Sequence, residues 1–212
     1  MLHSFMNIEI ETGPGVLVPR DETELLGYAA LELIAGVEEP VVIDMCCGSG
    51  NLGLAIAAAR PAAKVVGSDL MGEAVVTARR NVARLGLEAR VEILQGDMFA
   101  GPTGHGLEGT VDLVVCNPPY ISTIKLETDS AHLLDSEPRE AFDGGPYGIA
   151  IQMRLIAGAI SFLRPGGWIA FEFGAGQARQ ARALLARSGA YGTMRLLENA
   201  TGIPRVAIAS RL

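Results

Sequence analysis

The segment Asn117-Pro118-Pro119-Tyr120 combines residue types that are suited to chemistry. A mostly apolar run at residues 111–115 precedes it and predicts a buried strand of a parallel sheet. Proline has no amide hydrogen to donate to a neighbouring strand, so the strand must end at the first proline. Because ligands of open α/β sheets bind beyond the carboxyl ends of the strands, we expect this segment at an active edge.

These groups are suited to holding an NH2 group in one orientation. The side-chain oxygen of Asn117 and the backbone carbonyl of Pro118 can each accept a hydrogen bond from it. Two acceptors fix the nitrogen and direct its lone pair at an electrophile, while Tyr120 can cover the flat face of the attached group. A strand-ending turn without a chemical role would also use the two prolines, so the surrounding sequence has to decide between these interpretations.

A glycine-rich turn at residues 48–53 follows a predicted strand and opens a predicted helix. It reads Gly-x-Gly-x-x-Gly, and Asp69 comes about twenty residues later, which is the spacing of the dinucleotide fingerprint. Glycines allow a ligand to approach the backbone closely, and Asp69 can accept hydrogen bonds from both ribose hydroxyls. The turn alone is therefore compatible with a nicotinamide dinucleotide, with another nucleoside cofactor, or with a tight turn that holds no ligand.

Two further aspartates separate the two cofactor interpretations. Asp44 is at the end of the first predicted strand, where a carboxylate suits a cofactor with an ammonium group and a sulfonium but does not help a pyrophosphate. Asp97 follows the third strand and is placed to accept a hydrogen bond from an adenine amino group, with Met98 or Phe99 against the ring. Polar residues at four successive strand ends therefore favour a sulfonium-bearing nucleoside cofactor.

Strands and helices are predicted to alternate along the chain, which indicates an α/β fold with a doubly wound, Rossmann-like, seven-stranded sheet. The segment 122–147 is long, polar and without periodicity, so we predict a substrate lid there. A small hairpin is predicted at residues 7–18, around Gly13-Pro14-Gly15. The predicted strands are 41–44, 64–68, 91–94, 111–115 and 168–173, with an antiparallel pair at 194–197 and 205–209; the main helices are 24–35, 52–60, 72–85, 148–163 and 177–187.

Composition excludes several classes of protein. The 212 residues are 49% hydrophobic and 19% charged, which fits one globular domain with a full core. A net charge of -7 argues against a general nucleic-acid-binding surface. The three cysteines, two of them adjacent, form neither a disulfide framework nor a metal site. We find no signal peptide and no stretch that could span a membrane, so we expect a reducing, cytoplasmic location.

Three further segments, with the glycine turn and Asn-Pro-Pro-Tyr, are similar to the HemK-like family of glutamine N5-methyltransferases that modify peptide release factors. This family belongs to the class I S-adenosylmethionine-dependent methyltransferases, and the resemblance covers residues 16–212. One departure is Cys46, where the family has the first glycine of its cofactor turn. The three segments are Val16-Leu17-Val18-Pro19-Arg20-Asp21-Glu22-Thr23-Glu24, then Glu137-Pro138-Arg139-Glu140-Ala141 followed by Asp143-Gly144-Gly145, and Leu163-Arg164-Pro165-Gly166-Gly167-Trp168 with Glu172.

The resemblance implies the class I methyltransferase fold, S-adenosyl-L-methionine as cofactor, and N-methylation of a planar or amide-type NH2 group. It implies no metal. The predicted catalytic residues are Asn117, Pro118 and Tyr120. The predicted cofactor-binding residues are Arg20, Thr23, Asp44, Cys46, Gly48, Gly50, Asp69, Leu70, Asp97, Met98 and Asn117.

The methyl acceptor stays open at this point. A glutamine in a protein is the family default, and a small molecule is the main alternative. The remaining alternatives, in order of preference, are adenine N6-methylation of nucleic acid, a cofactor-binding scaffold subunit and an NAD-dependent oxidoreductase. The bacterial family members carry an N-terminal helical domain, whereas 15 residues precede Val16 here. We therefore expect one methyltransferase domain at 1–212, with a hairpin at 1–20. We expect this domain either to work with a small partner subunit or as a homodimer, or to act on a smaller acceptor. Alone, the chain is expected to modify free release factor poorly.

Overall fold

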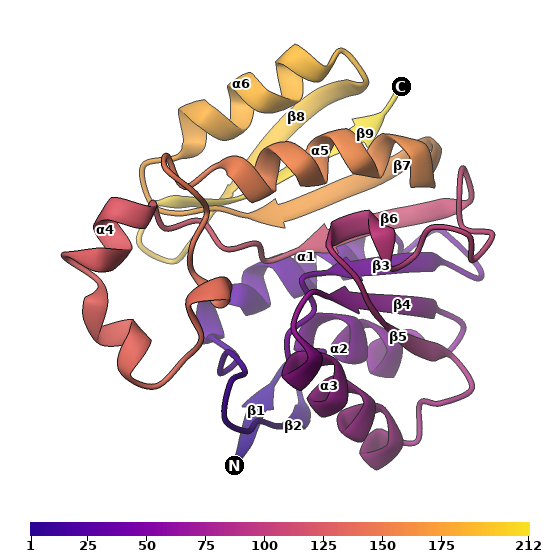
Figure 1. Cartoon of the computed structure of the whole chain (residues 1–212). Helices are drawn as coiled ribbons and strands as arrows, with labels where there is room; N and C mark the ends of the chain where they lie inside the picture. Colours follow the sequence, from indigo (N-terminus) through magenta and orange to yellow (C-terminus); the bar gives the residue numbers. More distant parts are fainter.

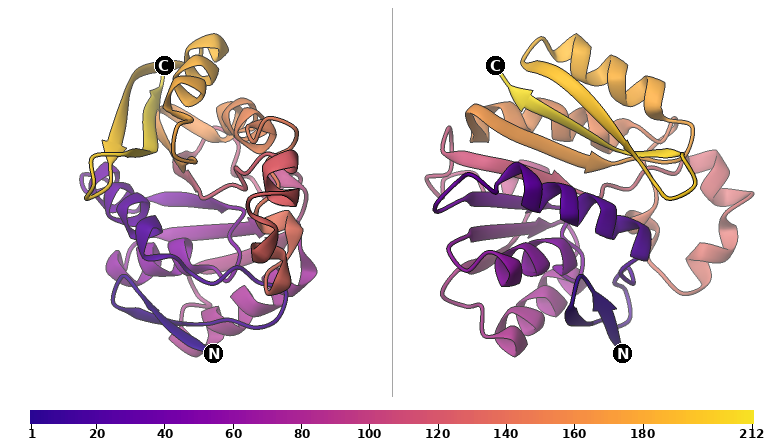
Figure 2. Two further views of the ribbon diagram at one scale, coloured as in Figure 1. Left: turned by 90° about the vertical axis from the view of Figure 1, so that its left-hand side faces the viewer. Right: turned by 180° about the vertical axis from the view of Figure 1, so that it is seen from behind.

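A seven-stranded sheet with helices on both faces forms the body of the protein (Figures 1 and 2). The computed structural model describes all residues, 1–212. The strand order is β5-β4-β3-β6-β7-β9-β8, parallel from β5 to β7 and antiparallel at the last two pairings. This order confirms the predicted doubly wound sheet with an antiparallel C-terminal strand pair. The strands are β3 (Val41–Met45), β4 (Lys64–Asp69), β5 (Val91–Gln95), β6 (Val111–Cys116), β7 (Leu163–Glu172), β8 (Tyr191–Glu198) and β9 (Pro204–Arg211).

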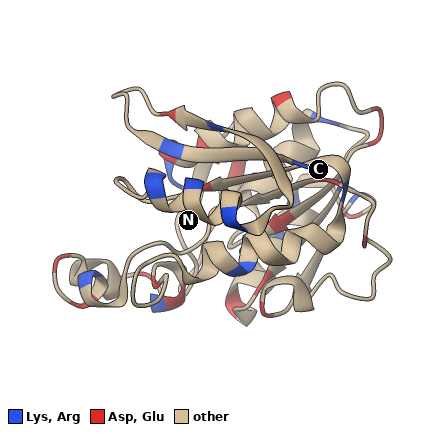
Figure 3. Ribbon diagram, turned by 90° about the horizontal axis from the view of Figure 1, so that it is seen from above, with Lys and Arg blue, Asp and Glu red and all other residues tan.

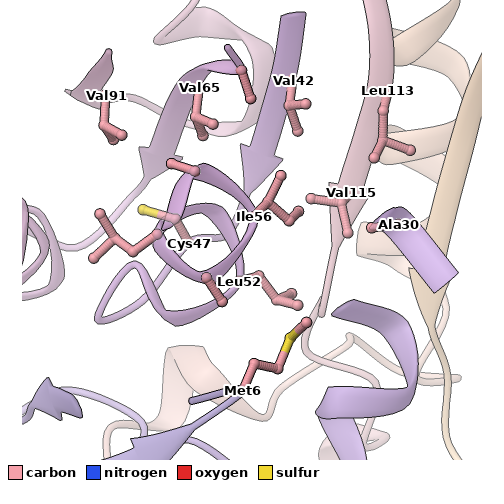
Figure 4. Close-up of a cluster of buried hydrophobic side chains, with 14 of the residues drawn as sticks. Met6, Ala30, Val42, Cys47, Leu52, Ile56, Val65, Val91, Leu113 and Val115 are labelled. Atoms are coloured by element: carbon pink, nitrogen blue, oxygen red, sulfur yellow. The ribbon is translucent and has the colours of Figure 1, made fainter. Parts of the chain in front are cut away.

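Each face of the sheet has its own hydrophobic core, because a parallel sheet is buried on both sides. On one face, Val42, Val65, Val91 and Leu113 point from four adjacent strands toward Ile56 and its neighbours (Figure 4). The helices of this face are α1 (Glu24–Leu33), α2 (Asn51–Ala59) and α3 (Gly72–Leu85), and those of the other face are α5 (Ala150–Phe162) and α6 (Ala178–Ser188). None of the helices is both long enough and apolar enough to cross a membrane.

The chain reverses its direction of travel across the sheet between β3 and β6. From β3 it proceeds outward through β4 to β5, and then returns to place β6 on the other side of β3. The register pairs Met45 at the end of β3 with Cys116 at the end of β6. The glycine-rich turn and the Asn117 segment therefore leave the sheet side by side, at the crevice where such folds bind ligands.

The N-terminal hairpin is real, but its predicted position is wrong. Its strands are β1 (Leu2–Phe5) and β2 (Ile8–Glu11), joined by Met6 and Asn7, both with positive φ (44° and 67°). Two such residues make the tight turn whose twist matches paired strands. The segment Gly13-Pro14-Gly15 instead leads away from the hairpin, and Gly15 and Val16 reach the crevice described below.

The segment 122–147 projects beyond the carboxyl ends of the strands, on the left of Figure 1. It is folded rather than irregular, with a bridge between Ile121 and Asp143 at its base. Arg139 holds it together through ion pairs with Glu127 and Asp143, with N–O distances of 2.8 and 2.9 Å. Its short helices are α4 (Thr123–Glu127), η3 (Ala131–Asp135) and η4 (Arg139–Ala141).

Candidate active site

A cavity of about 280 Å³ lies at the carboxyl ends of β3, β4, β5 and β6. Residues that follow all four strands line it, as the strand-end argument predicts. Residues 15–17 and part of the 122–147 segment complete the walls. The predicted cofactor-binding residues found in its walls are Cys46, Gly48, Asp69, Leu70, Asp97, Met98 and Asn117.

The other four predicted residues lie elsewhere. Arg20, Thr23 and Asp44 line a smaller adjoining cavity of about 30 Å³, which Asn117 and Gly48 also line. Gly50 lines neither cavity. It has a positive φ of 82°, and a Cβ built on it would lie 3.0 Å from Leu54 Cδ1, so this glycine serves the turn and the packing of α2.

Asp69 braces the glycine-rich turn. Its Oδ2 accepts a hydrogen bond from the Gly48 amide at 2.8 Å, and its Oδ1 accepts one from the Met71 amide at 2.9 Å. Burial raises the pKa of Asp69, and these amides oppose the shift. A Cβ built on Gly48 would meet no atom within 4 Å, so the turn is open on its outer side. The carboxylate and the open backbone fit a ribose diol held close to the turn.

Asp44 is a buried carboxylate with one unsatisfied oxygen. Its side chain is 1% exposed; Oδ2 accepts from the Gly53 amide at 2.8 Å, while Oδ1 has no hydrogen-bond partner. Burial raises the pKa of Asp44 to about 7, against the lowering effect of the Gly53 amide, and the nearby Asp69 adds to the rise. A buried carboxylate oxygen without a hydrogen-bond donor is energetically costly, and an ammonium group bound in the adjoining cavity would supply the missing donor.

We expect nearly one proton to be released from Asp44 when the protein binds S-adenosylhomocysteine, the demethylated form of the expected cofactor, at pH 6. With a pKa of about 7, Asp44 is mostly protonated in the free protein at pH 6, and a bound ammonium would favour its charged form. Calorimetric titration in buffers of different ionisation enthalpy measures the release. An Asp44→Asn variant should release none, and equal proton release by the variant and the wild type would contradict this role.

Asp97 and Met98 lie where the third strand end meets the cavity, as predicted. The Asp97 carboxylate pairs with Arg154 of α5 at 2.9 Å, a partner that the sequence did not indicate. Met98 begins η2 (Met98–Ala100) with a φ of +53° and is 8% exposed. The Cys46 thiol donates a weak hydrogen bond to the Met98 sulfur at 3.9 Å, and both residues line the cavity.

Asn117 is held by a buried chain of hydrogen bonds that leads to Glu172 of β7. The Asn117 amide donates from Nδ2 to Thr23 Oγ1 at 3.1 Å, and the Thr23 hydroxyl donates to Glu172 Oε2 at 2.8 Å. The Tyr120 hydroxyl and Arg205 Nη2 both donate to Glu172 Oε1, each at 3.2 Å. No role for Glu172 is predicted from the sequence, although Glu172, like Asp44, is a lone carboxylate at the end of an apolar strand.

A second large cavity, of about 260 Å³, adjoins the first. Its walls are mostly apolar and include the other two predicted catalytic residues. Asn117 and Leu17 line this cavity, the first large cavity and the small one. Asn117 therefore stands where the three spaces meet. The residues around the second cavity are Leu17, Arg20, Glu22, Asn117, Pro118, Tyr120, Ile121, Leu133, Ala141 and Phe142.

Comparison with known proteins identifies the protein family to which this chain is similar. The family described as "Methyltransferase small domain" matches residues 23–146. The release factor glutamine methyltransferase of Moorella thermoacetica is 39% identical over 207 residues, which are 98% of this chain and 71% of that protein. The enzyme of the same name from Caulobacter vibrioides is 39% identical over 186 residues, 88% of this chain and 63% of that protein.

Solved structures agree on the fold. The crystal structure of TrmN from Thermus thermophilus is 25% identical with a TM-score of 0.59, over 89% of this chain and 48% of that one. The catalytic domain of human METTL16, in complex with an RNA hairpin, is 16% identical with a TM-score of 0.71, over 95% and 74%. With a domain match over more than half of its length and this identity to its relatives, the chain belongs to the release factor glutamine methyltransferase family and is an S-adenosylmethionine-dependent methyltransferase.

Proposed function

We propose that the protein methylates the side-chain amide nitrogen of a glutamine in another protein, and that residues 1–212 form one methyltransferase domain. The observation that carries the proposal is the position of Asn117 in the wall shared by the two large cavities. One cavity has the polar strand-end residues suited to the cofactor. The other has the mostly apolar walls suited to the stem of an acceptor side chain, and Asn117 and Pro118 are part of these walls.

Each part of the cofactor has a candidate partner in the first cavity and its small neighbour. Asp69 would accept hydrogen bonds from the ribose hydroxyls, Asp97 from the adenine amino group, and Asp44 from the ammonium group. Gly48 would let the cofactor lie against the backbone. When bound, the cofactor would supply an electrophilic methyl group on its sulfonium and leave as the thioether S-adenosylhomocysteine, and the methylated nitrogen would give up one of its two hydrogens as a proton to solvent.

The acceptor nitrogen needs orientation, because the lone pair of an amide nitrogen is delocalised and poorly nucleophilic. Asn117 Oδ1 and the Pro118 carbonyl would accept its two hydrogens and favour a pyramidal nitrogen with the lone pair directed at the methyl group. The Tyr120 ring, in the same cavity wall, would cover the flat amide. Positioning of this kind lowers a barrier by roughly 7 to 11 kcal/mol.

A protein acceptor is favoured over adenine in nucleic acid by the charges around the second cavity. Arg20, in the wall of this cavity, is already paired with Glu137, and Arg205, which contacts the lining residue Tyr120, is paired with Glu22 at 2.9 Å. Phosphate binding depends on cations that are free to replace counterions. The 122–147 segment carries six acidic residues and only two basic ones, so it presents no basic face (Figure 3). The names of the relatives point to the same acceptor, a glutamine in a release factor.

We expect the purified chain, given S-adenosylmethionine with a labelled methyl group, to transfer the label to a glutamine of a release factor, at a slow rate when no partner subunit is present. Parallel reactions should contain adenine-bearing DNA and RNA oligonucleotides and a protein-free metabolite extract. Mass spectrometry of the labelled protein then locates the methyl group. Label in an oligonucleotide or a metabolite, with none in the release factor, would overturn the protein acceptor and favour the nucleic-acid or small-molecule alternative.

A further inference from the structure

Glu172 is a buried carboxylate for which the proposed mechanism has no direct use. It ends β7, is 1% exposed, and stands two hydrogen bonds away from Asn117. We infer that Glu172, acting through the hydroxyl of Thr23, is the positioning residue that fixes which way the Asn117 amide faces. The inference rests on the proposed function, in which Asn117 Oδ1 receives a hydrogen of the acceptor.

The direction of the hydrogen bonds decides the orientation. A threonine hydroxyl has one hydrogen, and an ionised carboxylate can only accept. Because Thr23 gives its hydrogen to Glu172 Oε2 at 2.8 Å, it can only accept from Asn117, so the NH2 group of Asn117 must face it. A flipped amide would place two acceptor oxygens against each other. The Asn117 oxygen is therefore turned away from Thr23 and kept for another donor.

Arg205 supplies the counter-charge that this arrangement requires. It donates to Glu172 Oε1 at 3.2 Å and to the Tyr120 hydroxyl at 3.0 Å, and its guanidinium carbon lies 5.7 Å from the centre of the Tyr120 ring. Tyr120 also donates to Glu172 Oε1. The Glu172 carboxylate thus orients both the Asn117 side-chain oxygen and the Tyr120 ring in the wall of the second cavity.

The hydroxyl of Thr23 makes no local hydrogen bond to the helix that follows it. Thr23 ends the 3-10 helix η1 (Asp21–Thr23), which leads directly into α1, and its side chain caps no amide of α1. Both hydrogen bonds of the hydroxyl go instead to Asn117 and Glu172, across 94 and 149 residues of sequence.

The test compares Thr23→Val, which keeps the shape and removes the hydroxyl, with Thr23→Ser, which keeps the hydroxyl. We expect Thr23→Val to lower kcat by about tenfold to a hundredfold, the range that misplacement of a reacting group produces. The KM for the release factor and the melting temperature should change little, and Thr23→Ser should restore most of the rate. Thr77→Val, at a buried threonine of α3 whose hydroxyl bonds Arg80, is the matched control and should keep wild-type kinetics.

A double-mutant cycle with Asn117→Ala separates positioning from a structural effect. In the Asn117→Ala background, with the residual rate followed by labelled methyl transfer, Thr23→Val should have no further effect on kcat. Equal losses in both backgrounds, a wild-type rate in Thr23→Val, or a failure of Thr23→Ser to restore the rate would each overturn the inference. A wild-type rate in Asn117→Ala would instead remove the role that the proposed mechanism gives to Asn117.

Glu172→Gln provides an independent arm should Thr23→Val fold poorly. Glutamine has the same shape but presents both a donor and an acceptor, so it no longer dictates the direction of the Thr23 hydrogen bond. We expect Glu172→Gln to lower kcat in the wild-type background by about tenfold and to have no effect in the Asn117→Ala background. An unchanged rate in the wild-type background, or a further loss in the Asn117→Ala background, would contradict positioning through Asn117.

Discussion

Replacement of Asn117 by alanine should lower kcat by about a hundredfold or more and leave the Kd for S-adenosylmethionine within about twofold. In the proposed mechanism the Asn117 oxygen holds the acceptor nitrogen, and removal of one preorganised hydrogen-bonding group from a reaction centre costs on the order of a hundredfold to a thousandfold. Because the interaction strengthens in the transition state, kcat and kcat/KM should fall together. Steady-state methyl transfer gives the rates, and calorimetry gives the affinity.

Asn199→Ala is the control for this variant. Asn199 lies in the turn between β8 and β9, where its Oδ1 accepts from Thr201 and the Ile203 amide. It should leave turnover unchanged. If Asn117→Ala turns over like the wild type, the acceptor nitrogen is held by other groups and the proposed mechanism is wrong. A loss confined to cofactor affinity would assign Asn117 to the cofactor alone.

The largest loss of cofactor affinity is expected from Asp69→Ala, at least a hundredfold in Kd. Two charge-assisted hydrogen bonds to the ribose hydroxyls would disappear, each contributing about 1.5 to 3 kcal/mol, and about 1.4 kcal/mol corresponds to a factor of ten. The variant also loses the brace on the Gly48 and Met71 amides, which adds to the effect. Calorimetry with S-adenosylhomocysteine measures the change, and circular dichroism verifies the fold.

A ligand comparison separates the ribose contact from the brace. The wild type should bind S-adenosylhomocysteine much more tightly than its 2′-deoxy analogue, and Asp69→Ala should bind the two about equally. If the variant still discriminates between them, Asp69 only supports the turn. Asp129→Ala, at an exposed position of the 122–147 segment, should behave like the wild type with both ligands.

The sheet and the first cavity could be predicted from the sequence because their signals are local. Buried parallel strands are continuous apolar runs, and each run here ends in a polar residue or a glycine. The ends of parallel strands meet at one edge, so Asp69, Asp97 and Asn117 could be placed in one cavity without coordinates of any kind. Asp44 was placed at the same edge, and it lines the small cavity next to the large one.

Features that depend on distant partners could not be predicted in this way. Glu22, Tyr120, Glu172 and Arg205 form one network, yet Glu22 and Arg205 are 183 residues apart. The hairpin was misplaced because glycine and proline normally mark turns, whereas Met6 adopts a left-handed conformation that is unusual for its residue type. The predicted helix 148–163 ends at Phe162, and β7 begins at Leu163, because Leu163 pairs with Val111 before the Pro-Gly-Gly segment.

In the proposed site, the buried carboxyl group of Asp44 would also couple folding to the supply of cofactor. Its pKa rises from 3.8 to about 7 on folding, so the folded state binds more protons than the unfolded state across this range, and stability falls as the pH rises through it. Above pH 7 the free protein carries a buried, unpaired charge, which an ammonium group would neutralise. Ligand that binds only the folded state then adds stability in proportion to the logarithm of its concentration. At neutral pH, S-adenosylmethionine would therefore raise the free energy of unfolding of the enzyme. In a cell with little S-adenosylmethionine, the enzyme would be less stable.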